Sequence, residues 1–187
     1  MKSFFALVVL ALGVSFGASA ASAQMSNDNP MVGGAAMYKT KNIVENAVNS
    51  ADHTTLVAAV KAAGLVATLA SAGPFTVFAP VNSAFDKLPA GTVETLLKPE
   101  NKATLTKILT YHVVAGNIDS KAVLKAIKKG NGKAELTTVA GGKITAMLEG
   151  GKVVIMDEKG GKSYVTIADV RQSNGVIHVV DSVLLPN

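Results

Sequence analysis

Residues 73–85 have the sequence GPFTVFAPVNSAF, whose composition is compatible with few structures. Residues 75–79 have the β-branched and aromatic content of a buried strand. Pro80 lacks the backbone donor that a sheet requires, so we predict that the strand ends there. Asn82 or Ser83 can cap the helical turn that follows. The segment therefore predicts a buried strand that leads directly into a short helix.

Two later segments accompany it. Residues 109–116, LTYHVVAG, place Tyr111 and His112 where a helix is expected to run into an extended strand. Residues 174–186, NGVIHVVDSVLLP, contain apolar side chains at both odd and even positions, which is typical of a strand buried on both faces. We expect that strand to be central, and His112 and His178 to be buried, neutral and hydrogen-bonded.

In this order and at these separations, the three segments resemble the first conserved block, the Tyr-His block and the second conserved block of fasciclin (FAS1) domains. The resemblance covers residues 41–187 and implies an α+β fold, a β-sandwich or wedge of short, mostly antiparallel strands flanked by several α-helices. In the family, the Tyr-His region is associated with both fold integrity and adhesion. The block residues that we take as structural or interaction candidates are Phe75, Thr76, Phe78, Ala79, Pro80, Asn82, Phe85, Tyr111, His112, Gly175, His178 and Asp181.

The rest of the chain divides near Ala134. Before it, from about residue 41 to 129, apolar residues recur at helical spacing. After it, short runs with a period of two are separated by paired glycines, which predicts an antiparallel meander. Asn174-Gly175 is the strongest hairpin signal, since both residues tolerate a positive φ.

Residues 1–23 have the pattern of a secretory leader. Lys2 supplies a positive start, residues 4–16 are apolar and uncharged, and Ala-Ser-Ala precedes Gln24. We expect cleavage after Ala23, with Ala20 as the alternative; a membrane anchor would need about 20 apolar residues. Residues 24–38 are polar and rich in glycine, and we expect a flexible lead-in there. A single fasciclin domain is expected over residues 39–187.

Composition argues against several function classes. The chain of 187 residues has no cysteine, which excludes disulfides and thiolate chemistry. Its formal charge is +5, yet Arg171 is the single arginine and aromatic residues make up 5%, which disfavours nucleic-acid binding. The three histidines have no metal-ligand spacing, and no nucleophile or phosphate-loop motif is present. We therefore expect no enzyme activity, metal or cofactor, and we expect His53, beside the capping Asp52, to face solvent.

A lysine face is expected on the helix that begins near Asp119 or Ser120. Its apolar residues oppose four lysines: Lys121, Lys125, Lys128 and Lys129. This is the one concentrated positive patch in the sequence. It is a solvated helix face and also a candidate contact surface.

The resemblance implies a non-catalytic, secreted protein, periplasmic or extracellular, that mediates cell adhesion or protein and matrix interactions. Its partner would be a surface or matrix protein or a polysaccharide, with no nucleic acid and no membrane span after leader cleavage. Neither Asp169 nor Asp181 matches the integrin-reading position of some animal members. The alternative function is a carrier for a small apolar ligand such as a carotenoid, which some fasciclin-like proteins bind. Met147 and Met156 would then line a groove.

Overall fold

The computed structural model describes residues 29–187, and a seven-stranded sheet lies at its centre. The strands follow the order β4-β3-β9-β8-β7-β6-β5. Every neighbouring pair is antiparallel except β3 and β9, which are parallel. Their bounds are β3 Phe75–Pro80, β4 Val113–Ala115, β5 Lys133–Thr137, β6 Lys143–Glu149, β7 Lys152–Met156, β8 Lys162–Gln172 and β9 Gly175–Val180. The expected α+β fold with mostly antiparallel strands is confirmed.

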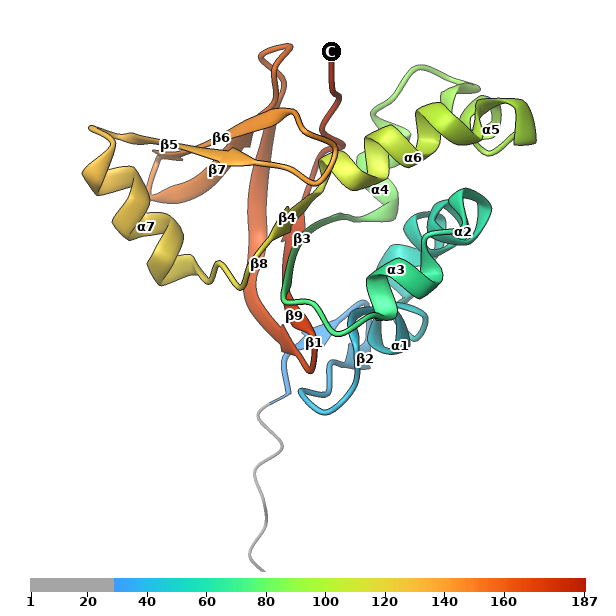
Figure 1. The fold of residues 1–187 in the computed structure, drawn as a ribbon, viewed down its shortest axis with the longest axis horizontal. Coiled ribbons are helices and arrows are strands. Elements are labelled where there is room, and N and C mark those ends of the chain that lie inside the picture. The colour runs from blue at the N-terminus through green and yellow to red at the C-terminus, as the bar shows by residue number, and fades with distance from the viewer. Residues whose placement is uncertain (1–28) are drawn as a thin grey trace, which may run out of the picture.

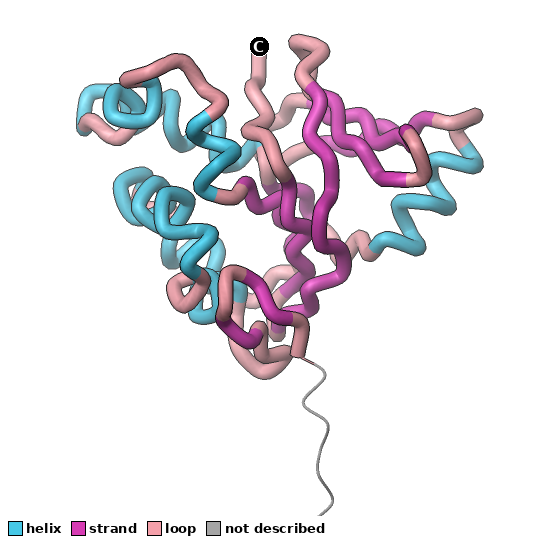
Figure 2. Tube along the Cα trace, turned by 180° about the vertical axis from the view of Figure 1, so that it is seen from behind, coloured by secondary structure: helices cyan, strands magenta, loops and turns pink. Residues whose placement is uncertain are grey.

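Helices cover the strands from two sides. Helices α1 to α6 gather on one side of the strands and α7 lies on the other (Figures 1 and 2). Their bounds are α1 Ile43–Ala47, α2 Thr54–Ala63, α3 Val66–Ala70, α4 Asn82–Asp86, α5 Thr92–Leu96, α6 Lys102–Tyr111 and α7 Ser120–Lys129, with short 3-10 turns at Ala51–His53 and Pro99–Asn101. The change of period near Ala134 is confirmed, since only strands follow α7. Within residues 29–187, no helix is both long and apolar enough to cross a bilayer.

The sheet curls until its two end strands meet. Strand β8 is 11 residues long and has register shifts between Val165 and Val170, which bend the sheet. At the ends, the backbone amide of Val139 donates to the carbonyl of Val113 at 2.7 Å, and Val114 forms a bridge with Thr138. The curled sheet therefore forms a wedge with an interior.

Apolar clusters lie on both faces of the central strands. Val77, Ala79, Ile177 and Val179 join the cluster beneath the helices. The alternate residues of the same strands, such as Phe78 and Val180, join the cluster inside the curled sheet, which α7 also covers. All six residues of β9 are buried, which confirms that this strand is central.

The expected flexible lead-in is not what the structure shows for residues 31–38. Strands β1 (Met31–Val32) and β2 (Ala35–Ala36) form a small antiparallel hairpin. Val32 and Met37 are 3% and 2% exposed and belong to the cluster beneath the helices. Because most of this segment is polar or glycine, its pattern did not predict that Val32 and Met37 are buried by elements distant in the sequence. The leader at 1–23 and residues 24–28 lie outside the described part of the chain.

The Asn174-Gly175 hairpin exists for a different reason from the one predicted. Neither residue has a positive φ, and the turn lies at residues 173–174. Gly175 instead begins β9, where a Cβ atom would collide with the carbonyl oxygen of Phe75. The close approach of β9 to β3 therefore requires a residue without a side chain at position 175.

Two predicted helix caps were also wrong. Helix α4 begins at Asn82 with Val81 as its N-cap, and Asn82 makes no cap within its own helix. Its Oδ1 accepts from the backbone amide of Thr55 at 3.1 Å, so it caps α2 instead. Asp52 therefore does not cap α2; it lies within the preceding 3-10 turn.

Candidate functional site

Tyr111, at the end of α6, is fixed inside the protein. Its exposed fraction is 0%. The hydroxyl donates to the carbonyl of Lys143 at 2.7 Å and accepts from the amide of Glu158 at 3.1 Å. Burial raises the pKa of Tyr111, with the nearby Glu158 and Asp157 charges adding to the effect and the Glu158 amide opposing it. Tyr111 thus joins three chain segments.

His112 is buried with both ring nitrogens hydrogen-bonded. Nδ1 lies 2.8 Å from the carbonyl of Ile108, and Nε2 accepts from the amide of Leu184 at 2.9 Å. Because Nε2 is an acceptor, the proton is on Nδ1 and the ring is neutral. Burial lowers the pKa of His112 to about 4, although the Ile108 carbonyl and Asp157 oppose the shift. The expectation of a buried, neutral, bonded histidine is confirmed.

His178, on β9, has the same character. Its ring stacks on Phe78 with centroids 5.6 Å apart. Nε2 lies 2.9 Å from the carbonyl of Ile118, and the amide of Asp169 donates to Nδ1 at 3.4 Å. Burial lowers the pKa of His178, and the Ile118 carbonyl, Asp169 and Asp119 raise it in part.

The predicted block residues meet as a structural framework around the strands. Thr76 Oγ1 donates to the carbonyl of Gly116 at 2.7 Å and accepts from the amide of Ile118 at 2.8 Å. The amide of Phe78 donates to the carbonyl of His112 at 2.9 Å. Asp181 accepts from the amide of Tyr164 at 2.9 Å. The Thr76 and Phe78 contacts join the first block to the Tyr-His block, and the parallel pairing of β3 with β9 joins the first block to the second conserved block. Asp181 also lies 3.5 Å from Lys87 Nζ.

The predicted solvent exposure of His53 is wrong. It is 2% exposed, whereas solvent exposure was expected. Nδ1 lies 2.9 Å from Ser50 Oγ, and Nε2 is a buried nitrogen with no hydrogen-bond partner among residues 29–187. Burial lowers the pKa of His53, opposed in part by the Ala79 backbone and the Asp52 charge. The 3-10 turn at Ala51–His53 directs the ring inward, and no local sequence pattern signals that direction.

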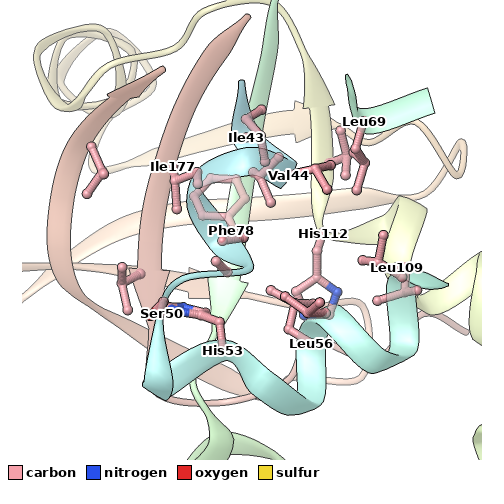
Figure 3. A pocket seen from close by; sticks show the side chains of 18 of the residues that line it. Ile43, Val44, Ser50, His53, Leu56, Leu69, Phe78, Leu109, His112 and Ile177 are labelled. Atoms are coloured by element: carbon pink, nitrogen blue, oxygen red, sulfur yellow. Dashed lines mark hydrogen bonds between the residues drawn. The ribbon is translucent and has the colours of Figure 1, made fainter. Parts of the chain in front are cut away.

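The ring of His53 borders an apolar cavity of about 50 Å³ between the helices and the sheet. Figure 3 shows the cavity with Ser50, His53 and His112 among labelled apolar side chains. Residues of the sheet that line it are Val77, Phe78, Ala79, Val113, Val170, Ile177 and Val179, and all of them are buried. Sequence reasoning missed this cavity, since its walls come from segments more than 100 residues apart.

Met147 and Met156, which we expected to line a ligand groove, do not line this cavity. Both are half-buried in β6 and β7.

The four lysines of the α7 face are all exposed, as expected. None of them lies within 4.0 Å of an acidic oxygen in the described part of the chain. Asp119 caps α7 by accepting from the amide of Ala122 at 2.9 Å, and it also pairs with Arg171 at 3.1 Å. The helix is thus anchored at its start, while its lysine face remains free of ion pairs among residues 29–187.

No group of three or more His, Asp or Glu side chains in residues 29–187 has the arrangement of a metal site. What the geometry offers is a positively charged helix face and an apolar cavity, on opposite sides of the central strands (Figure 1).

The fold and the three joined blocks define a fasciclin domain. A family model of the fasciclin domain matches residues 51–186, so the chain belongs to the fasciclin family. The structure of a FAS1 domain pair from the insect cell adhesion molecule fasciclin I shares the fold, with a TM-score of 0.68 at 22% identity, over 78% of this chain and 51% of that one.

Individual bacterial proteins are similar in sequence. Protein sll1483 of Synechocystis sp. is 47% identical over 184 residues, which are 98% of this chain and 94% of that protein. Immunogenic protein MPB70 of Mycobacterium bovis is 37% identical over 145 residues, 75% of this chain and 66% of that protein. Cell surface glycolipoprotein MPB83 of the same species is 36% identical over 122 residues, 65% of this chain and 48% of that protein.

Proposed function

We propose that this protein is a non-catalytic, exported fasciclin protein that mediates adhesion by binding a polyanionic surface or matrix partner through α7. The observation that carries the proposal is the lysine face, four exposed ammonium groups without acidic partners in the described chain. Relatives that include a cell surface glycolipoprotein and an insect cell adhesion molecule support it.

The spacing of the lysines suits a repeating anionic polymer. Lys121, Lys125 and Lys128 are separated by four and three residues on one helix face, and Lys129 follows Lys128 directly, four residues after Lys125. They extend over eight residue steps, or about 12 Å at the rise of an α-helix. A polysaccharide with carboxylate or sulfate groups presents charges over such a length, and the attraction weakens as salt screens it.

Binding of the purified protein to immobilised dextran sulfate tests this assignment. We expect Lys125→Glu to weaken binding about threefold to tenfold, because it replaces one exposed attraction by a repulsion. Lys98→Glu is the matched control: it makes the same charge change at an exposed residue next to α5, away from α7. Equal losses in the two variants would assign binding to net charge, and absence of binding at low salt would contradict the proposal.

Export is the second part of the proposal. The leader-like residues 1–23 imply a mature protein that begins at Gln24 and acts in the periplasm or outside the cell. N-terminal sequencing of protein recovered outside the cytoplasm is expected to give Gln-Met-Ser. A sequence that begins at Met1 would refute leader cleavage.

Carriage of a small apolar ligand is the second candidate function, and the cavity beneath the helices favours it. Extraction of protein purified from its native source with an organic solvent, followed by mass spectrometry and absorption spectroscopy, tests for a carried molecule. An extract without a stoichiometric apolar compound would contradict carriage.

A further inference from the structure

The cavity beneath the helices contains one polar atom whose hydrogen bond is not satisfied. In residues 29–187, Nε2 of His53 is the single buried side-chain nitrogen or oxygen without a partner. The other nitrogen of this ring, Nδ1, is already paired with Ser50 Oγ. Buried polar groups are nearly always hydrogen-bonded, and each one left unpaired destabilises the fold. An exception inside a cavity therefore points to a ligand atom that completes the pair.

The composition of the cavity wall restricts the rest of the ligand to apolar groups. Apart from the Ser50 and His53 pair, the interior polar side chain is His112, whose two nitrogens are both occupied by backbone groups. The remaining buried walls are aliphatic or aromatic. A ligand with a second polar atom would bury it without a partner.

Its size excludes an extended molecule. The volume of about 50 Å³ corresponds to roughly four water positions, which is the space of one small ring. A long polyene is too large to be enclosed there.

The route from solvent runs between α1, α2 and α3. All cavity residues from the strands are buried, whereas the half-buried or exposed ones belong to these three helices. They are Val44, Ala47, Val57, Lys61 and Val66. A ligand that enters at this edge would pass between these helices and leave the pairing of the strands unchanged.

We propose that this cavity binds a compact, ring-sized apolar molecule with one hydrogen-bonding atom, which pairs with Nε2 of His53. The inference rests on the second candidate function and names its site and ligand class. Since the Ser50 hydroxyl can donate to Nδ1 or accept from it, Nε2 is an acceptor in one tautomer and a donor in the other. A ligand hydroxyl pairs with either form.

Phenol and toluene are probes that test the proposal, because they have similar shapes and differ in the hydroxyl. Their affinities for the full chain are measured by NMR titration. In the variant Ser50→Ala, His53→Phe, both partners of the buried pair are replaced by apolar groups, a change that preserves packing better than the loss of one partner. We expect the ratio of phenol affinity to toluene affinity to fall roughly tenfold in this variant.

Two further variants control the measurement. Ala47→Leu adds bulk to a residue that lines the cavity, and we expect it to abolish binding of both probes. Lys98→Glu, at an exposed residue that does not line the cavity, is expected to bind both probes as the unchanged protein does. A ratio that does not change in the Ser50→Ala, His53→Phe protein, binding that survives Ala47→Leu, or failure of the unchanged protein to bind phenol would each overturn the proposal.

The probe titration and the extraction experiment test different claims, so one can give a negative result without the other. If the protein carries no native compound but binds phenol through His53, the site is supported and carriage in the cell is refuted. If the protein carries an apolar compound but does not bind phenol, this site is refuted and the compound is carried at another site.

Discussion

The three histidines are all buried, and two of them join segments that are far apart in the chain. His112 links the end of α6 to the C-terminal segment at Leu184, and His178 links β9 to the loop at Ile118. Each is buried and has a lowered pKa. His53 shares the burial and the lowered pKa but has a free nitrogen, so it alone has hydrogen-bonding capacity left for a ligand.

Stability is expected to fall as the solution becomes acidic. The pKa of His112 is about 4 in the folded protein and 6.5 in an unfolded chain, so between these values the unfolded state binds the proton and the folded state does not. This contribution is fully present above pH 6.5 and is lost as pH falls to about 4. The change amounts to roughly 3 kcal/mol for His112. His53 and His178 shift in the same direction. Urea unfolding at several pH values measures the slope.

The variant His112→Ala identifies the source of that slope. It leaves the Leu184 amide and the Ile108 carbonyl without their partner, and we expect a loss of about 1–3 kcal/mol at pH 7. It should also make stability less dependent on pH between 6.5 and 4. Lys125→Glu, an exposed change, is the control and should barely alter melting. Unchanged melting of His112→Ala combined with lost adhesion would make the Tyr-His segment a contact site.

At the scale of elements, Asn82 connects two helices that are far apart in sequence. It begins α4, yet its Oδ1 accepts from the Thr55 amide and the Thr54 hydroxyl, both at 3.1 Å, at the start of α2. Its Nδ2 donates to the carbonyl of Ala51 at 2.8 Å. The side chain thereby positions α2, one wall of the cavity.

Replacing this side chain should loosen the start of α2. We expect Asn82→Ala to lower the free energy of unfolding by about 1 to 2 kcal/mol, the usual loss for a helix cap. Ser83→Ala, next to it and exposed, is the matched control. Chemical denaturation of both variants measures the difference. Equal stability of Asn82→Ala and the unchanged protein would show that the distant cap contributes nothing.

Much of the fold followed from periodicity. The helices before Ala134, the strands after it and the two-sided burial of β9 are local patterns of apolar residues, and the structure confirms them. The family blocks placed Tyr111 and His112 at the end of a helix, as observed.

The candidate site was not predictable in the same way. The inward direction of His53, the distant cap by Asn82 and the burial of Met37 depend on contacts between segments that local patterns do not relate. For the same reason, the cavity beneath the helices was not expected, and Met147 and Met156, which were expected to line a groove, do not line it. The lysine face was predictable, because it is a property of one helix.

For the whole molecule, the curled sheet separates the two proposed binding features. Helix α7 packs against β5 and the cluster inside the sheet, whereas the cavity lies beneath the opposite face. The two clusters contain alternate side chains of the same central strands. Changes on α7 and changes in the cavity are therefore expected to act independently, as distant sites usually do.

This architecture predicts a gradient of local stability. Strand β9 is buried throughout and pairs with β3 on one side and β8 on the other. Strand β5 is last in the sheet order, has exposed residues and is fully paired only with β6. Opening β5 thus exposes less apolar surface than opening β9, and local openings need less free energy than unfolding of the whole molecule.

Native-state hydrogen exchange measures this gradient amide by amide. We expect the hydrogen-bonded amides of β3 and β9 to exchange only through global unfolding, so their exchange free energies should equal the value from denaturant titration. Those of β5 should be lower by several kcal/mol, because the end strand opens while the centre stays folded. Exchange rates that rise tenfold per pH unit would confirm that opening is at equilibrium. Equal protection of β5 and β9 would mean that the contact between the end strands, through Val113 and Val139, makes the curled sheet unfold as one unit.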